Sequence, residues 1–195
     1  MATGESFAAL VLAAGSGSRF GGGKLLADWR GAPLLHGALA AARAAPVGSV
    51  TVVTGADAAA VEAAARAFDP EVRVVHAPDH AEGMAASLRA GVAALPGDAA
   101  GVFVFLGDMP RVPHAVLAAL ARAVAEGAPA AAPVFGGVRG NPVVLSRSLL
   151  PQVAALKGDA GARPILKALG ERLARVEAPD DGILFDVDAP ADLGR

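Results

Sequence analysis

Short apolar runs alternate with alanine- and leucine-rich stretches along the chain up to residue 134. The runs typical of buried β-strands are residues 7–12, 50–54, 72–75, 101–106 and 130–134. The stretches between them with high helical propensity are residues 33–45, 57–68, 84–95 and 113–126. This βαβα series predicts a mostly parallel sheet covered by helices on both faces, with ligands bound beyond the carboxyl ends of the strands.

The pattern is less regular after residue 134. A turn-rich stretch at residues 136–142 leads into a short predicted strand at 143–145. The elements expected after it are helical pieces near 148–156 and 162–170 and strand-like segments at 172–176 and 183–187. A chain of this length ordinarily builds one core, so we expect a single domain spanning residues 1–195.

Composition narrows the classes of protein that fit this pattern. Hydrophobic residues make up 54% of the chain, many of them alanine, and no run is long and uninterrupted enough to span a bilayer. The N-terminus has no basic region ahead of an apolar stretch, and the chain has no cysteine, which excludes disulfides and thiolate metal sites. A net charge of -2 gives no basic footprint for nucleic acid. We therefore expect a cytoplasmic protein that binds neither membrane nor nucleic acid.

A glycine-rich segment follows the first predicted strand and carries the main functional signal. It runs from Leu12 through Ala13, Ala14 and Gly15 to Lys24, with Arg19 inside it. Glycines let backbone N–H groups turn toward an anion, and the two cations can offset phosphate charge. A Walker loop is excluded because leucine, not serine or threonine, follows Lys24. The segment predicts a nucleoside triphosphate site, and a passive glycine-rich hairpin is the structural alternative.

Carboxylates at the ends of two later apolar segments form a second constellation. Asp108 lies just past the predicted strand 101–106. Asp186 lies in the predicted strand 183–187, and Asp188 lies one residue past its end. Two carboxylates beside a triphosphate suit Mg²⁺, which is usually held by one or two carboxylates plus substrate phosphates. On an extended strand Asp186 and Asp188 would point to opposite faces, and we favour Asp188 as the second ligand because it lies nearer the turn at Pro190.

Other polar residues predict contacts to the nucleotide base and to an acceptor. Gly83 opens an expected helix whose first N–H groups, with Ser87 one turn later, can contact the base or sugar. Arg139, Asn141 and Arg163 lie in the irregular C-terminal part, where an elongated, phosphorylated acceptor needs cations and polar groups. His76, Asp79 and His80 do not predict a zinc site, because the sequence offers neither a fourth ligand nor a zinc motif around them. Trp29 is expected to pack after the glycine loop or to form a wall of the site.

A set of motifs then resembles a known family. They are, in chain order, Leu12-Ala13-Ala14-Gly15, Ser18-Arg19-Phe20-Gly21 with Lys24, Glu82-Gly83-Met84 with Ser87-Leu88, Gly107-Asp108-Met109-Pro110, Arg139-Gly140-Asn141-Pro142, Gly158-Asp159 with Gly161-Ala162-Arg163, and Asp186-Val187-Asp188-Ala189-Pro190. They span nearly the whole chain, and their order resembles that of the molybdenum cofactor cytidylyltransferases, relatives of the molybdenum cofactor guanylyltransferase.

The resemblance implies a fold, a reaction and partners. The implied fold is a Rossmann-like three-layer α/β/α nucleotidyltransferase fold, and the implied reaction joins CTP to molybdopterin with Mg²⁺ to give molybdopterin cytosine dinucleotide and pyrophosphate. It places Asp159 with the acceptor-binding residues Arg139, Asn141 and Arg163, and it implies a molybdenum hydroxylase as recipient of the product. Ala13-Ala14 resembles the cytidylyl enzymes, whereas guanylyl enzymes more typically have two glycines there, which favours CTP over GTP.

The residues themselves predict a transfer chemistry and leave its acceptor open. An acceptor phosphate would attack the α-phosphorus in line, with Arg19 and Lys24 on the β- and γ-phosphates, Asp108 and Asp188 on the metal, and loop amides on the base or ribose. A sugar phosphate or another small phosphorylated acceptor would fit the same loop and aspartates. A non-catalytic cofactor-delivery chaperone is an alternative from another class, against which the intact charged residues argue.

Overall fold

The fold is built on one large, mostly parallel sheet. The structure is a computed structural model, and it describes residues 6–194. Across the sheet the strands run in the order β10 (Leu173–Glu177), β7 (Ala130–Phe135), β9 (Val143–Ser146), β6 (Gly101–Leu106), β1 (Phe7–Ala13), β4 (Val47–Thr54) and β5 (Arg73–His76). β9 is antiparallel to both of its neighbours, and the short strand β8 (Val138–Arg139) pairs antiparallel with β7. The remaining pairs are parallel.

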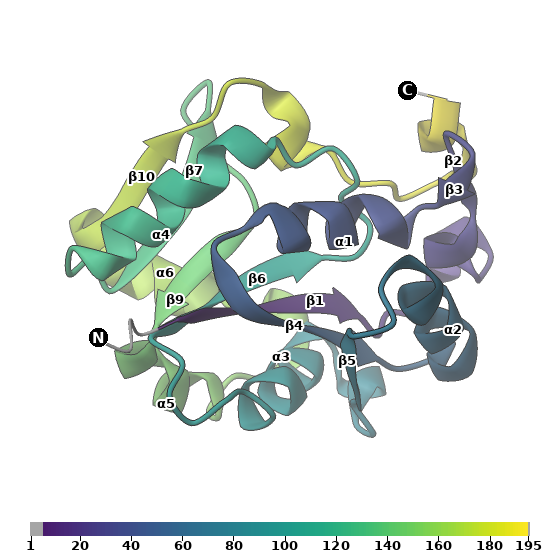
Figure 1. Cartoon of the computed structure of the whole chain (residues 1–195), viewed down its shortest axis with the longest axis horizontal. Helices are drawn as coiled ribbons and strands as arrows, with labels where there is room; N and C mark the ends of the chain where they lie inside the picture. The colour runs from purple at the N-terminus through teal and green to yellow at the C-terminus, as the bar shows by residue number, and fades with distance from the viewer. Residues whose placement is uncertain (1–5, 195) are drawn as a thin grey trace.

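Helices cover both faces of this sheet (Figure 1). One face packs against α1 (Leu35–Ala44), α2 (Ala58–Phe68) and α4 (Leu117–Ala125). The other face packs against α3 (Met84–Ala93), α5 (Leu150–Val153) and α6 (Arg163–Leu169). The three-layer α/β/α architecture expected from the sequence is therefore confirmed, and no helix within residues 6–194 has both the length and the apolar content that crossing a membrane requires.

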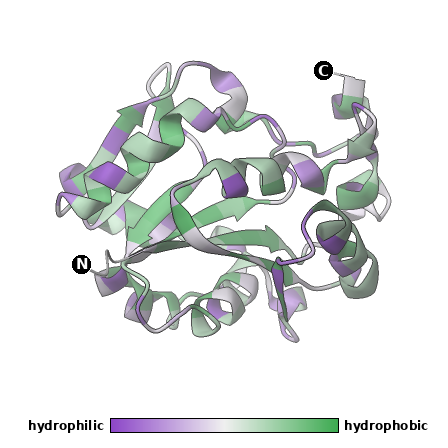
Figure 2. Ribbon diagram, in the orientation of Figure 1, coloured by the Kyte–Doolittle hydropathy of each residue, from purple (hydrophilic) through white to green (hydrophobic). Residues whose placement is uncertain are grey.

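The strand pattern explains why the central strands read as continuous apolar runs. Along β1, Ala9 and Val11 enter the cluster under α1, whereas Leu10 and Leu12 enter the cluster under α3, so neither face of the strand meets water. Colouring by hydropathy shows hydrophobic strands in the interior and hydrophilic positions mainly on the outer sides of the helices (Figure 2).

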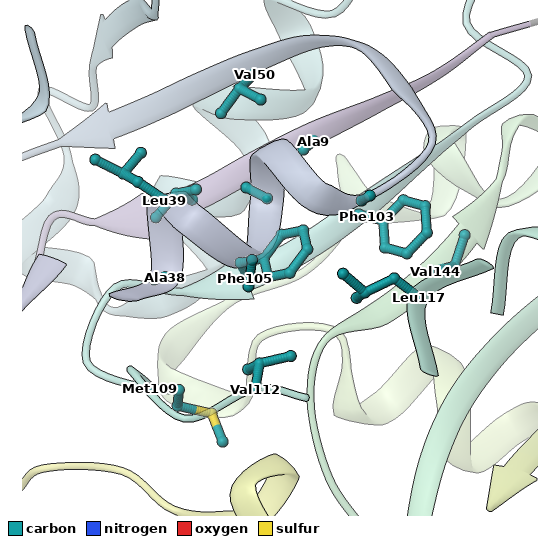
Figure 3. Packing of buried hydrophobic residues seen from close by; sticks show 14 of the residues in the cluster. Ala9, Ala38, Leu39, Val50, Phe103, Phe105, Met109, Val112, Leu117 and Val144 are labelled. Carbon is teal, nitrogen blue, oxygen red and sulfur yellow. The ribbon is translucent and has the colours of Figure 1, made fainter. Parts of the chain in front are cut away.

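The core fixes the central strand that ends at the candidate site. Phe103 and Phe105 of β6 are both buried, and their rings stack with centroids 5.8 Å apart. Leu117 of α4 and Leu39 of α1 belong to the same cluster (Figure 3). A strand packed this tightly on both faces holds the backbone after Leu106, and with it Asp108, in a defined place.

Several boundaries differ from the sequence-based expectation. The predicted strand at 183–187 is wrong, because a 3-10 helix, Asp181–Leu184, is followed by an irregular segment. This segment makes isolated backbone hydrogen bonds, from Asn141 to Ile183 and from Val187 to Asp108, rather than a strand ladder. The helix expected at 148–156 is reduced to a 3-10 turn and α5. The hairpin of β2 (Asp28–Trp29) and β3 (Ala32–Pro33) and the short β8 were not predicted.

Candidate functional site

A cavity of about 570 Å³ opens at the carboxyl ends of β1 and β6. Leu12 and Leu106, which are paired across these two strands, lie at its base. The residues that line the rest of it come from the glycine loop, the start of α3 and two later turns: Ala14, Gly15, Ser16, Ser18, His80, Ala81, Gly83, Met84, Ser87, Asp108 and Asp159. The cavity lies where open parallel sheets ordinarily bind ligands.

The glycine loop turns back on itself beside this cavity. Its two 3-10 turns, Ser18–Phe20 and Lys24–Leu26, are joined by three glycines with φ of 91°, 97° and 63°. A side chain is strained at such angles, so glycine is required for the reversal. Gly17 has a second constraint, because a Cβ there would lie 3.0 Å from the Cβ of Lys24. The loop thereby brings Lys24 back toward the sheet edge.

The loop cations contact the two candidate metal-binding aspartates. The Nζ of Lys24 donates to Oδ2 of Asp108 at 2.6 Å and lies 3.7 Å from Oδ1 of Asp188. Nη1 of Arg19 lies 3.3 Å from Oδ2 of Asp188. The Lys24 side chain is 14% exposed and that of Arg19 is 82% exposed. Solvent therefore screens the Arg19 contact much more than the Lys24 contacts.

Asp186 belongs to the same electrostatic neighbourhood. Partial burial raises the pKa of Asp186, and the nearby carboxylates of Asp188 and Asp108 raise it further, against smaller lowering effects of its backbone hydrogen bond and Lys24. Since the segment is not a strand, the expected opposite facing of Asp186 and Asp188 does not follow from strand alternation. Only Asp188 of the two has a side-chain contact with Lys24 or Arg19 among the described residues.

A small apolar cluster holds the aspartate-bearing segment in place. Buried Trp29 packs with Val187 and lies 5.6 Å, ring to ring, from Phe185. Phe20 of the glycine loop packs on the same cluster, which ties the loop to this segment. The Val187 amide donates to the Asp108 carbonyl at 3.1 Å. Trp29 thus has the packing role that the sequence predicted, under the segment that carries Asp186 and Asp188.

The opposite wall of the cavity is the start of α3. Gly83 precedes this helix with φ of 112°, and a Cβ there would lie 2.4 Å from Oδ1 of Asp159 and 2.7 Å from the carbonyl of Gly158. Glycine at this position therefore allows the turn at residues 158–160 to approach the helix N-terminus. Ser87 follows one turn later and is 5% exposed. The first N–H groups of α3 point toward the cavity end of the helix.

A second, smaller cleft of about 110 Å³ adjoins the first. It shares Leu12, Met84 and Leu106 with the larger cavity, and Arg139, Asn141 and Arg163 line its other side. The backbone hydrogen bond from Asn141 to Ile183 fixes this side against the C-terminal segment. The cleft offers cations and an amide beside the place where a nucleotide phosphate would lie.

The structure thus brings most of the expected site residues together. Leu12, Ala14, Gly15, Gly83, Ser87 and Asp108 line the large cavity, and Lys24, Arg19 and Asp188 meet at Asp108. One placement differs from expectation, because Asp159 lines the large cavity rather than the smaller cleft. The Ala13 side chain packs in the core under α1, so only the backbone of Ala13 can make the predicted contact to a nucleotide.

Sequence reasoning missed several residues at the site. Ser16, Ser18 and His80 line the large cavity, and Oδ2 of Asp192 accepts hydrogen bonds from the amides of Asp188 and Ala189. The serines lie within the glycine loop and were open to prediction from it. Asp192 gave no signal, because an Asx-type cap depends on a turn that residue types alone do not specify.

The donor set at Asp108 and Asp188 fits a divalent metal such as Mg²⁺ or Mn²⁺. Both groups are oxygen ligands, and no group of three or more histidine, cysteine, aspartate or glutamate side chains in residues 6–194 is arranged for a metal. A pair of carboxylates is what Mg²⁺ needs when phosphate oxygens and water complete its shell. Lys24 provides the positive charge between the two carboxylates in this structure.

Gly15→Ala is expected to weaken nucleotide binding without loss of stability. Gly15 lines the cavity, and a Cβ there meets no atom within 4 Å, so the methyl group would occupy space meant for a ligand. We expect a Kd for nucleotide raised about tenfold, with an unchanged melting temperature. Isothermal titration and thermal melts check this, with Gly97→Ala, also open but away from the cavity, as control. Equal nucleotide affinity in the two variants would argue against a nucleotide at Gly15.

Comparison with known protein families gives a clear match. The family model described as a MobA-like NTP transferase domain covers residues 9–175, which is most of the chain. This range contains the glycine loop, the start of α3, Asp108 and the residues of the smaller cleft. Asp186 and Asp188 lie beyond it.

Three similar proteins illustrate the range of relatives. Nicotine blue oxidoreductase of Paenarthrobacter nicotinovorans is 31% identical over 95% of this chain and 94% of its own. Molybdenum cofactor cytidylyltransferase of Escherichia coli K12 is 26% identical over 94% and 92%. The crystal structure of Rv0371c from Mycobacterium tuberculosis H37Rv superposes with a TM-score of 0.86 and 30% identity over 99% and 98%. A second structure of Rv0371c is a manganese complex, with a TM-score of 0.77 and 28% identity over 90% and 89%.

Proposed function

Because the chain belongs to the MobA-like NTP transferase domain family, we propose that it transfers the cytidylyl group of CTP to the phosphate of molybdopterin. The observation that carries the proposal is Lys24 held between Asp188 and Asp108, the second of which lines the large cavity. The cytidylyltransferase relative, alike over nearly its whole length, supports the choice of reaction. The product would pass to a molybdenum hydroxylase.

The reaction requires positioning and charge neutralisation rather than a side-chain nucleophile. An oxygen of the acceptor phosphate forms a bond to the α-phosphorus, and the bond from that phosphorus to the bridging oxygen breaks, releasing pyrophosphate. Lys24 and Arg19 would hold the β- and γ-phosphates and offset the charge that develops on the leaving group. The acceptor phosphate is already ionised near neutral pH, so no base has to remove a proton from it.

The two aspartates would share one task, which is to hold the metal. Asp108 and Asp188 would hold Mg²⁺, which when bound withdraws charge from the α-phosphate oxygens. Asp108 is fixed by the tightly packed β6, and Asp188 by the amide contacts to Asp192. The manganese complex of Rv0371c supports divalent metal binding in this fold.

In this proposal each cavity takes one of the two substrates. The larger cavity would take CTP, with its base and ribose between Gly15 and the start of α3 at Gly83 and Ser87. The smaller cleft would take the phosphorylated end of molybdopterin against Arg139, Asn141 and Arg163. Asp159 lies at the large cavity beside Gly83, so we place it between the two substrates.

A different acceptor and a redox reaction are the alternatives that the assay must separate. A sugar phosphate would use the same loop and aspartates, and the relative named nicotine blue oxidoreductase points to redox chemistry in the family. Hydride transfer needs no pair of carboxylates for a metal, which favours transfer of a nucleotidyl group here. Purified protein should therefore be incubated with CTP, Mg²⁺ and molybdopterin, and separately with sugar phosphates and with NAD(P)H. Pyrophosphate release from CTP with molybdopterin, but not with the sugar phosphates, supports the proposal. Oxidation of NAD(P)H without any release of pyrophosphate overturns it.

CTP is expected to be preferred over GTP by about a hundredfold in kcat/KM. Ala13-Ala14 stands where the guanylyl enzymes more typically have two glycines, and discrimination by a few backbone and steric contacts is worth a few kcal/mol at most. Initial rates of pyrophosphate release with each nucleotide at saturating acceptor measure the ratio. Equal kcat/KM for the two nucleotides would rule out this base assignment.

A further inference from the structure

A third cavity, of about 500 Å³, continues from the acceptor cleft away from the nucleotide. It shares Arg139, Arg163 and Leu166 with that cleft and adds Lys167 and Arg175. We call the cavity around these four cations the basic groove. No acidic residue lines it among the part of the chain that the structure describes.

The strand register explains why cations from separate elements meet there. Arg175 of β10 is paired with Ala132 of β7, and Arg139 of β8 is opposite Val134. Ala132 packs in the cluster under α6, and Val134 is two residues later on the same strand, so both arginines project on the α6 side of the sheet. Arg163 and Lys167 are four residues apart on α6 and therefore share one side of that helix.

The four cations are unpaired within residues 6–194, where none of them makes a salt bridge or a side-chain hydrogen bond. Arg43, Arg66, Arg89 and Arg111, by contrast, each pair with an acid. Glu177 stands two residues beyond Arg175 on β10 but does not line the groove. Four like charges around one concave site raise the local positive potential and concentrate anions there, although the net charge of the protein is -2.

From this geometry we infer that the basic groove is an anion-binding site, separate from the triphosphate site, for a small ligand bearing a phosphate-class dianion. Guanidinium groups recognise such oxygens through paired, charge-assisted hydrogen bonds, and three of the four cations are arginines. The dianion has two possible sources. It is either a second anionic group at the far end of the acceptor, which rests on the proposed function, or a free anion such as inorganic phosphate, which does not.

Inorganic phosphate is the first probe, because it needs no assumption about the acceptor. In a titration of ¹⁵N-labelled protein, we expect saturable shifts of the Gly137 and Gly170 amides, which line the groove. Lys167→Gln combined with Arg175→Gln should weaken the binding reported by these amides at least about tenfold. Arg73→Gln combined with Arg122→Gln makes the same charge change at exposed arginines elsewhere and should leave it unchanged. Lys24→Met should also leave it unchanged, which separates the groove from the triphosphate site.

Two results would overturn the inference: no saturable shift at Gly137 and Gly170, or equal weakening in the groove variant and the Arg73/Arg122 control. Kinetics with the acceptor then identify the source. A higher KM for acceptor in the groove variant, with unchanged KM for nucleotide, assigns the site to the acceptor. An unchanged KM for acceptor, with phosphate binding intact in the wild type, assigns it to a free anion. Absence of nucleotidyl transfer would refute the proposed function and leave the phosphate titration standing.

Discussion

Asp108→Asn is expected to lower turnover by about a hundredfold or more. The substitution keeps the shape of the side chain but removes the negative charge that would hold the metal against the α-phosphate, and groups that stabilise a reacting phosphate contribute several kcal/mol. Asp108 contacts Lys24 at 2.6 Å and its side chain is only 23% exposed, so solvent screens its charge less than that of a surface carboxylate. Turnover measured across a Mg²⁺ titration tests this, and we expect the variant to require more Mg²⁺.

Matched variants of the C-terminal aspartates complete this test. Asp188→Asn should cost more activity than Asp186→Asn, because Asp188 contacts both Lys24 and Arg19. Asp186→Asn should cost less activity, because burial and the nearby carboxylates of Asp188 and Asp108 raise the pKa of Asp186 and so favour its neutral form, which asparagine resembles. Thermal melts of all three variants exclude unfolding. Normal turnover in Asp108→Asn would refute the metal assignment. A larger loss of activity in Asp186→Asn than in Asp188→Asn would make Asp186, not Asp188, the second metal ligand.

The sequence predicted the sheet well because its central strands are buried on both faces. A strand such as β1, with core under α1 on one side and under α3 on the other, leaves an uninterrupted apolar run that needs no tertiary information to be recognised. The residues that follow such runs can be predicted as site residues in the same way, since ligands bind at the carboxyl edge of a parallel sheet. Gly15 and Asp108 were found in this way.

The C-terminal segment was mispredicted because its conformation depends on distant partners. Residues 183–187 are mostly apolar, as in a strand, yet the Ile183 side chain is buried in the core cluster under α1 and α4, and Val187 is buried beside Trp29. The backbone of this segment is hydrogen-bonded to the Asn141 amide and the Asp108 carbonyl rather than to a neighbouring strand. Such isolated contacts come from elements far apart in the chain. For the same reason the basic groove, whose cations come from β8, α6 and β10, could not be read from spacing in the sequence.

Lys24→Met is expected to change nucleotide and metal binding in opposite directions. Methionine retains much of the apolar stem but not the ammonium group, so the Kd for CTP should rise at least about tenfold and kcat should fall. In the free protein the same ammonium group neutralises Asp108 and Asp188, to which it lies 2.6 and 3.7 Å away. Its loss leaves these carboxylates facing each other, and Mg²⁺ should therefore bind the nucleotide-free variant more tightly than the wild type.

Calorimetric titration of Mg²⁺ and of CTP into the two proteins measures both effects. If Lys24 had only a structural role, its loss would lower stability without weakening CTP binding and strengthening Mg²⁺ binding. Thermal melts with and without Mg²⁺ test this difference. The variant should lose stability at low ionic strength and regain it when the metal is added. Lys157→Met, at an exposed lysine that does not line the cavity, is the matched control. If Lys24→Met bound CTP as tightly as this control, the glycine loop would not be a triphosphate cradle. If CTP binding weakened but Mg²⁺ affinity did not increase, the triphosphate would contact Lys24 while the metal lay away from Asp108 and Asp188.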